Sequence, residues 1–327
     1  MIKSLLYICL LTVSLSHAQL SYPPDADTEG TTAISKSSTV FVAWATGVEV
    51  ERGYIQISDP TVTHMGSNKA SYGSPSDAIG EPDIAVVSLG DGGIAIVTFE
   101  KPITNGEGYD FAVFENGSNT FLELAFVEVS SDGANFFRFP AHSETQTDTS
   151  IGGFGSIDAR NLNNLAGKYK ADYGTPFDLD DVPDNLLLDK SKITHVKLID
   201  VVGSLETEYA TVDSFGNKIN DPYPTPFYSG GFDLAGVGVI NQGVLSTDGV
   251  NALQFTVYPN PANELLSVNL GNLDTANVTL YDTSGRIVLV NKLSGSGDIN
   301  VSSLSAGIYH LEISTESIRS IKQIVIK

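Results

Sequence analysis

Cysteine is nearly absent from this sequence. The chain has 327 residues, and its single cysteine is Cys9, inside the apolar N-terminal stretch. We expect that stretch to be removed on export, which leaves a mature chain without cysteine. Disulfide bonds and thiolate metal sites are therefore excluded from the mature protein.

Basic residues are also scarce. The chain has 18 Lys and Arg residues against 39 Asp and Glu residues, and its formal net charge is -21. Nucleic-acid binding requires a basic surface that displaces counterions, so we expect no nucleic-acid partner. An anionic membrane surface is excluded as a partner for the same reason. Hydrophobic residues make up 41% of the chain, which is enough for a packed core.

Long apolar runs are missing after the N-terminus. Residues 1–18 combine a basic start at Lys3, an apolar run over 5–13 and the small-x-small sequence Ser16-His17-Ala18. This order is typical of a secretory signal peptide. No later segment is apolar enough to cross a bilayer, so we predict export and no integral membrane segment in the mature chain.

Short apolar segments bounded by Gly, Pro, Asn or Asp follow a polar lead-in at residues 19–38, which we predict to be flexible. We predict strands at 39–45, 84–89, 93–99, 110–115, 123–130, 193–201 and 233–240. Residues 123–130 alternate, which favours one solvent-facing side, and 159–169 is the best helix candidate. We expect an all-β fold, with a large jelly-roll-like β-sandwich over residues 39–240, the cargo domain.

A second unit follows a linker-like run at residues 241–254. From residue 255 to 327, strand patterns recur at 265–270, 277–282, 286–292, 307–314 and 320–327. This spacing favours a small Ig-like β-sandwich. The second unit is nearly neutral, with six acidic and five basic residues, so the negative charge belongs to the cargo domain.

Four motifs in the second unit occur in a characteristic order. They are VYPNPA at 257–262, LYDTSGR at 280–286, LSAGIY at 304–309 and IKQIVIK at 321–327. Residues 255–327 resemble the type A C-terminal sorting domain of the type IX secretion system. The resemblance implies the type IX secretion machinery as a partner, passage across the outer membrane, and delivery to the cell surface of a Gram-negative bacterium.

Acidic turns are a feature of the cargo domain. Carboxylates on irregular backbone suit Ca²⁺, which takes six to eight oxygen ligands. We expect a structural Ca²⁺ ion held by acids that flank predicted strands, namely Asp77, Glu81, Asp83, Asp110 and Glu115. The alternative is that these acids form turns by bonding their own backbone.

The cargo domain also resembles a recurring acidic module of secreted bacterial surface proteins. Residues 72–240 carry the sequences GEPD, SLGDGG, GYDFAVFENG and VEVSSDG. Their general style is similar to the discoidin-like jelly rolls of carbohydrate-binding modules. This resemblance implies a fold but no residue-level activity, because one fold hosts many functions.

Aromatic residues in two loops are candidates for ligand binding. Prolines stiffen residues 221–228, and the stretch 141–190 is too long for a plain connection. Rigid aromatic faces suit sugar rings, so we expect a glycan or another small ligand to contact Tyr169, Tyr173, Tyr223, Phe227 and Tyr228. The alternative is that these rings cover the core at one end of the sandwich.

No catalytic motif is present. There is no nucleophile elbow, no zinc-binding His motif and no phosphate-binding Gly loop. We therefore name no catalytic residue and expect a secreted, noncatalytic cell-surface binding protein. The alternatives are a hydrolase with an unrecognised carboxylate pair, whose partners sequence cannot identify, and a structural or adhesive surface component.

Overall fold

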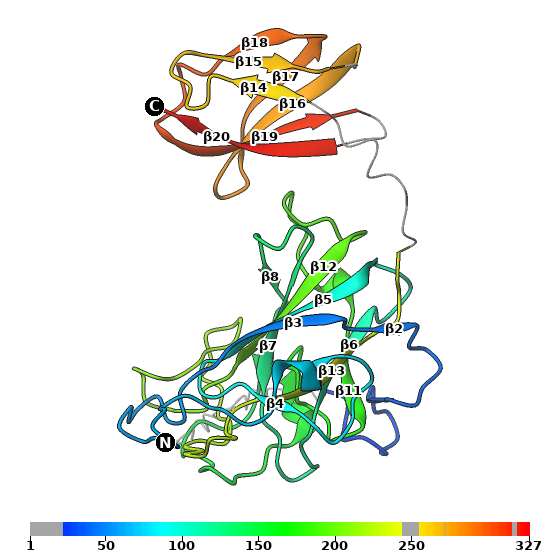
Figure 1. The fold of residues 1–327 in the computed structure, drawn as a ribbon, viewed down its shortest axis with the longest axis vertical. Helices are drawn as coiled ribbons and strands as arrows, with labels where there is room; N and C mark the ends of the chain where they lie inside the picture. Colours follow the sequence, from blue (N-terminus) through cyan, green and yellow to red (C-terminus); the bar gives the residue numbers. More distant parts are fainter. Residues whose placement is uncertain (1–21, 244–254, 272, 316–318) are drawn as a thin grey trace, which may run out of the picture.

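The structure is a computed structural model that describes residues 22–243, 255–271, 273–315 and 319–327. The predicted signal peptide at residues 1–18 lies outside the described residues, and so does the predicted linker except for residues 241–243. Two all-β units, the cargo domain and the C-terminal unit, make up the rest (Figure 1).

Two antiparallel sheets build the cargo domain. The first sheet contains, in order of neighbours, β1 (Ile34–Ser35), β11 (Tyr173–Phe177), β6 (Phe111–Glu115), β13 (Asp233–Val239) and β2 (Ala43–Trp44), and β4 (Val87–Ser88) also pairs with β13. The second sheet contains β3 (Gly47–Glu51), β5 (Ile94–Ile103), β12 (Ile193–Asp200), β7 (Ala125–Ser130) and β8 (Phe137–Arg138). A separate pair consists of β9 (His142–Ser143) and β10 (Leu162–Asn163).

The strand order is that of a jelly roll. Eight strands, taken along the chain, are β2, β5, β6, β7, β8, β11, β12 and β13. Numbered one to eight along the chain, these strands have the order 1-8-3-6 in one sheet (β2, β13, β6, β11). In the other sheet the order is 2-7-4-5 (β5, β12, β7, β8). This is the double Greek-key order of jelly rolls, so the predicted fold is confirmed.

The main core lies between the two sheets. Val113 and Val237 of the first sheet are fully buried, as are Val97, Val127 and Leu198 of the second. Inward-facing β-branched residues on both sheets are the expected source of stability for such a sandwich. Packing of this core fixes the strand ends, and with them the side chains at the ends of the sandwich.

The outer face of β7 is covered rather than solvent-exposed, contrary to the prediction from its alternating pattern. Five of its six residues are buried, and Phe126 packs in a second cluster with Ala141, Leu162 and Leu165. The long stretch 141–190 therefore supplies a lid of apolar side chains to the second sheet. A pattern of alternation cannot show that a distant segment covers the polar face.

Two further local predictions are corrected. The helix predicted at 159–169 is one 3₁₀ turn, η2 (Ala159–Asn161), followed directly by β10. The lead-in is not free: Ile34 pairs with Gly174 in β11, and Ala26 is buried. Two other 3₁₀ turns are η1 (Pro75–Ala78) and η3 (Leu179–Asp181). In the described residues, no helix is long and apolar enough to cross a membrane.

The C-terminal unit is a second, smaller β-sandwich. One sheet contains β14 (Thr256–Tyr258), β15 (Leu265–Asn269) and β18 (Gly297–Asn300), and the other contains β17 (Ile287–Ser294), β16 (Thr275–Asp282), β19 (Gly307–Ser314) and β20 (Arg319–Ile326). The turn between β16 and β17 is closed by Asp282, whose carboxylate accepts hydrogen bonds from the backbone N–H of Ser284 and of Arg286. The five strands predicted here are present, and β14 and β18 are additional.

Candidate functional site

Six buried carboxyl groups gather at one end of the cargo sandwich, and we call them the acid cluster. They lie on the connections β4–β5, β6–β7 and β12–β13 or on the strand residues next to them, and they belong to Asp91, Glu115, Glu123, Asp200, Asp221 and Asp233. Strand pairing explains the gathering, because Leu234 is the register partner of Glu115, and Asp200 is the partner of Ala125. Antiparallel neighbours bring the end of one strand beside the start of the next.

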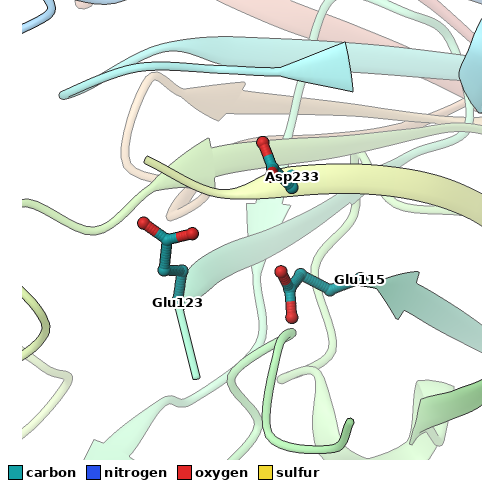
Figure 2. A group of neighbouring side chains, drawn as sticks. All are labelled: Glu115, Glu123 and Asp233. Atoms are coloured by element: carbon teal, nitrogen blue, oxygen red, sulfur yellow. The ribbon is translucent and has the colours of Figure 1, made fainter. Parts of the chain in front are cut away.

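Three members of the cluster approach one another closely. Glu115 ends β6, Glu123 lies two residues before β7, and Asp233 begins β13 (Figure 2). One oxygen from each of the three carboxylates lies within 4.8 Å of the others, and in the described residues this is the only group of three or more such side chains. We call these three residues the carboxylate trio. It joins both sheets, since β6 and β13 belong to one and β7 to the other.

The trio is poorly supplied with hydrogen-bond donors. Glu115 Oε2 accepts a bond of 2.6 Å from the backbone N–H of Gly117. Glu115 Oε1 and Asp233 Oδ1 are buried, and neither has a partner among the described residues. Buried polar atoms are nearly always partnered, so each of these exceptions requires a physical explanation.

Of the other three carboxyl groups, Asp91 and Asp200 accept short hydrogen bonds, whereas Asp221 is less well satisfied. Asp200 accepts bonds from the N–H groups of Gly92 at 2.9 Å and Phe232 at 2.7 Å, and Asp91 accepts one from Ile57 at 2.8 Å. Asp221 accepts one long bond from Leu124 N–H, while its Oδ1 is buried without a partner in the described residues. These groups hold the connections together around the trio.

Burial raises the pKa of every carboxyl group in the acid cluster. It raises the pKa of Asp91 to about 7, and burial together with the charge of Asp91 raises that of Asp200 to about 8. The pKa values of Glu115 and Glu123 are held well above their usual range by burial and by the neighbouring carboxylates. Burial raises the pKa of Asp233 to about 6. The charged forms are therefore costly unless a cation compensates them.

No basic side chain forms an ion pair with the acid cluster in the described residues. Arg52 is the nearest candidate, because its charge lowers the pKa of Asp233. Its guanidinium instead donates to the backbone carbonyls of Tyr72, Gly73 and Ser88. When these carboxyl groups ionise, no basic side chain of the described residues forms an ion pair that neutralises them.

The structure corrects the metal-ligand set expected from sequence. Only Glu115 of the five lies in the trio. Asp110 lies directly before β6, and Glu115 is the last residue of that strand. The two side chains are therefore about 17 Å apart along the strand, because each strand residue rises by about 3.3 Å. Asp77 bonds the backbone N–H of Ser74 in the turn η1, and Glu81 is exposed. Asp83 bonds the adjacent N–H of Ile84, although it lines the same surface cavity as Glu115.

The aromatic residues expected to bind ligand are distributed over different environments. Tyr169 and Tyr223 are buried, and their hydroxyl groups bond Thr32 and Ser58 in the interior. The hydroxyl group of half-buried Tyr173 donates to Asp27 of the lead-in. Only Phe227 and Tyr228 are exposed, so the predicted five do not form one binding surface.

Two aromatic groups meet at Phe227 and Tyr228. The first group consists of Phe121, Phe154 and Phe227, with ring centroids 6.3 Å apart for Phe121–Phe154 and 5.9 Å apart for Phe154–Phe227. In the second group, Tyr228 stacks on His64 at 4.2 Å and lies 6.1 Å from Tyr72. Sequence reasoning missed Phe154, since nothing in the pattern of residues 141–190 distinguishes an exposed ring from a buried one.

Comparison with solved structures finds distant similarity to bacterial enzymes. A β-glucuronidase from Faecalibacterium prausnitzii has 12% identity and a TM-score of 0.21, with coverage of 90% of this chain and 46% of that one. A β-glucuronidase from Ruminococcus gnavus in complex with uronic isofagomine has 10% identity and a TM-score of 0.23, with coverage of 93% and 45%. The chain spans less than half the length of these enzymes, and such TM-scores support no conclusion about fold or activity.

Comparison with protein families identifies the C-terminal unit. No curated protein matches the chain. Residues 256–327 match the family of the secretion system C-terminal sorting domain, which agrees with the four motifs and with the boundary of the second sandwich. The C-terminal unit is thus a type IX sorting domain, and the chain is a secreted protein that is delivered to the cell surface.

Proposed function

We propose that the cargo domain is a noncatalytic domain that binds a glycan at the cell surface through the first aromatic group. One observation carries this proposal: the Phe154 side chain is 78% exposed and lies between the rings of Phe121 and Phe227. A group of neighbouring rings that is exposed to solvent marks an interaction site more often than a single exposed apolar residue does.

The loop that carries Phe154 is held in place. The Asn220 side-chain amide donates to the carbonyls of Gln146 at 2.7 Å and Thr149 at 2.9 Å, and it accepts from Ile151 N–H at 3.2 Å. A Cβ atom on Gly153 would lie 2.1 Å from the carbonyl oxygen of Pro224, so the loop also packs closely on the segment before Phe227. Such a preorganised platform loses little entropy when a ligand binds.

Polar side chains next to the platform suit the hydroxyl groups of a sugar. The connection β6–β7 presents Asn116, Ser118, Asn119 and Thr120 on the surface, directly before Phe121. A pyranose ring has an apolar face that stacks on aromatic rings and a rim of hydroxyl groups that need hydrogen bonds. The combination of a ring platform and a polar rim therefore supports a glycan-like ligand.

The burial of the acid cluster argues against hydrolysis by these carboxylates. Glu115, Glu123 and Asp233 are only 2%, 6% and 7% exposed. A glycosidase needs two carboxyl groups that reach both sides of a sugar bond. Carboxylates at this depth have no room for a substrate between them, which supports binding rather than catalysis.

A glycan array that includes cobalamin, probed with the mature chain, tests the proposal. We expect binding to a defined set of glycans, and Phe154→Ala should weaken it about tenfold or more because the central ring is lost. Phe215→Ala is the matched control, since Phe215 is also exposed but contacts His142 elsewhere. Equal losses in the two variants, or release of new reducing ends from the glycan, would contradict the proposal.

A further inference from the structure

We propose that Glu115, Glu123 and Asp233 bind one Ca²⁺ ion where the connection β6–β7 meets the start of β13. This site is distinct from the five residues expected from the sequence, and it does not depend on which ligand the aromatic platform takes. Figure 2 shows the three side chains as neighbours that come from three different segments of the chain.

The spacing of the trio fits one cation. Ca²⁺ lies about 2.3–2.6 Å from its oxygen ligands, so two oxygens on one ion are separated by at most about 5 Å. The three carboxylate oxygens lie within 4.8 Å of one another. Because each carboxylate can bind through one or two oxygens, the trio supplies between three and six ligands.

A buried hydroxyl group beside the trio is the second, independent observation. Ser88 is fully buried in β4, and its hydroxyl group faces Asp233, whose pKa it lowers. Ser88 is the register partner of Asp233, so the two side chains lie on the same face of the sheet. A hydroxyl group that gives its proton to a carboxylate keeps its oxygen lone pairs free, so Ser88 adds one more oxygen that a cation beside Asp233 can bind.

Protonation of the carboxyl groups alone explains the site less well. A protonated carboxyl group gains an O–H donor that also needs a partner. Two buried oxygens of the trio, Glu115 Oε1 and Asp233 Oδ1, have no such partner in the described residues. A divalent cation satisfies these oxygens together and offsets their charge, while Arg52 is engaged by backbone carbonyls.

The ligand chemistry selects calcium over other divalent ions. All the candidate ligands are oxygens, which disfavours the metals that prefer sulfur or imidazole. They come from the irregular ends of strands in two sheets, and Ca²⁺ tolerates such geometry whereas Mg²⁺ requires a near-ideal octahedron.

A path for the ion leads to Glu115. A surface cavity of about 330 Å³ is lined by Glu115 and Asn116, by the exposed acid Asp83, and by Lys36 in its ion pair with Asp172. Acidic side chains at a cavity mouth raise the local concentration of cations. The cavity therefore gives an ion access from the surface to Glu115, the member of the trio that lines it.

The test uses the mature chain after chelation and dialysis, titrated with CaCl₂ by calorimetry and melted with and without the ion. We expect one Ca²⁺ ion per chain and a rise in the melting temperature of the cargo domain of roughly 5–10 °C at saturation. Glu123→Gln should abolish this rise while leaving the metal-free melting temperature equal to or above that of the wild type, because it removes a buried like charge.

Glu107→Gln is the matched control, since Glu107 is exposed in the connection before β6, at the opposite end of that strand. It should keep the full calcium-dependent rise. If Glu123→Gln does not fold, Asp233→Asn replaces it, and the calorimetric titration of the wild type needs no variant. No heat of binding, an equal rise with Mg²⁺ at the same concentration, or an unchanged rise in the trio variant would overturn the assignment.

Discussion

The two ends of strand β6 both have a buried carboxyl group, and they differ in what surrounds it. Before the strand, Asp110 accepts hydrogen bonds from Gly106 N–H, Leu179 N–H and the Asn241 side chain at 2.8, 2.8 and 2.9 Å. At its far end, Glu115 Oε2 accepts a bond from Gly117 N–H, while Oε1 is buried without a partner of good geometry among the described residues. Burial alone therefore does not distinguish a structural acid from a metal ligand.

The completeness of the hydrogen-bond shell makes that distinction. Asp110 is held by neutral donors from three segments and ties the sandwich end together. Glu115 instead faces Glu123 and Asp233, which have the same charge. The first arrangement is stable by itself, whereas the second requires a proton or a cation.

The pH dependence of stability gives the largest expected effect. A carboxyl group whose pKa is higher in the folded state binds its proton more tightly when folded, so its stabilisation is greatest at low pH and is lost as pH rises through the folded pKa. Burial raises the pKa of Asp91 to about 7 and that of Asp200 to about 8. The metal-free chain should thus lose stability from pH 5 to pH 7, by about 1.4 kcal/mol per pH unit for each group.

Urea unfolding at several pH values, with chelator, measures this slope. Asp200→Asn should make the slope shallower, because it removes one of the carboxyl groups whose pKa is raised in the folded state. Calcium should also reduce it, because a nearby cation favours the ionised carboxylates. Stability that is flat or rises between pH 5 and pH 7 in the metal-free chain would show that these carboxyl groups are not buried as described.

Asp110→Asn is expected to destabilise the cargo domain by about 3 kcal/mol, because an amide NH₂ group would face donors and leave them unpaired. This loss should be the same with calcium and with chelator, since Asp110 lies at the other end of β6 from the trio. Denaturant unfolding in both conditions checks it. If the stability loss appeared only with calcium, the metal would bind near Asp110 and not at the trio.

Glu115→Gln should have the opposite dependence. With calcium at about a hundredfold excess over its dissociation constant, the variant should lack roughly 2.7 kcal/mol of ligand-linked stability. With chelator it should match the wild type or exceed it, because the repulsion from Asp233 is relieved. Destabilisation of equal size in both conditions would make Glu115 a structural acid like Asp110.

The smallest effect concerns the aromatic platform, and it rests on the proposed glycan binding. Glu115 and Glu123 flank the segment that carries Phe121, and Asp233 follows the segment that carries Phe227. Calcium should hold both segments, so chelation should weaken glycan binding by about threefold through the cost of reordering them. Binding isotherms with calcium and with chelator test this, and identical affinities would separate the platform from the metal site.

Much of the fold could be predicted from the sequence. The long strands β5, β7, β12 and β13 follow from their runs of Val, Ile and Leu, and the jelly roll follows from their number and spacing. Short strands such as β11 were missed, because its sequence includes Gly174 and Pro176 and its pairing with β6 is fixed by tertiary contacts. The packed lead-in was missed for the same reason.

The candidate metal site was predicted only in part. Glu115 was chosen because it ends a predicted strand, and Glu123 and Asp233 occupy the same kind of position at the start of two others. Acids at the ends of predicted strands are thus the sequence feature that all three members of the trio share. Which ends share one side of the sandwich depends on strand order, and sequence alone does not supply that order.

The most direct test of the calcium site is a crystal structure of the mature chain grown with CaCl₂, with anomalous diffraction data collected to locate the ion. The structure predicts an anomalous peak among Glu115, Glu123 and Asp233, within about 2.6 Å of an oxygen from each. A trio without a peak, in which the carboxyl groups share protons through short hydrogen bonds, would contradict the assignment of calcium to this end of the sandwich.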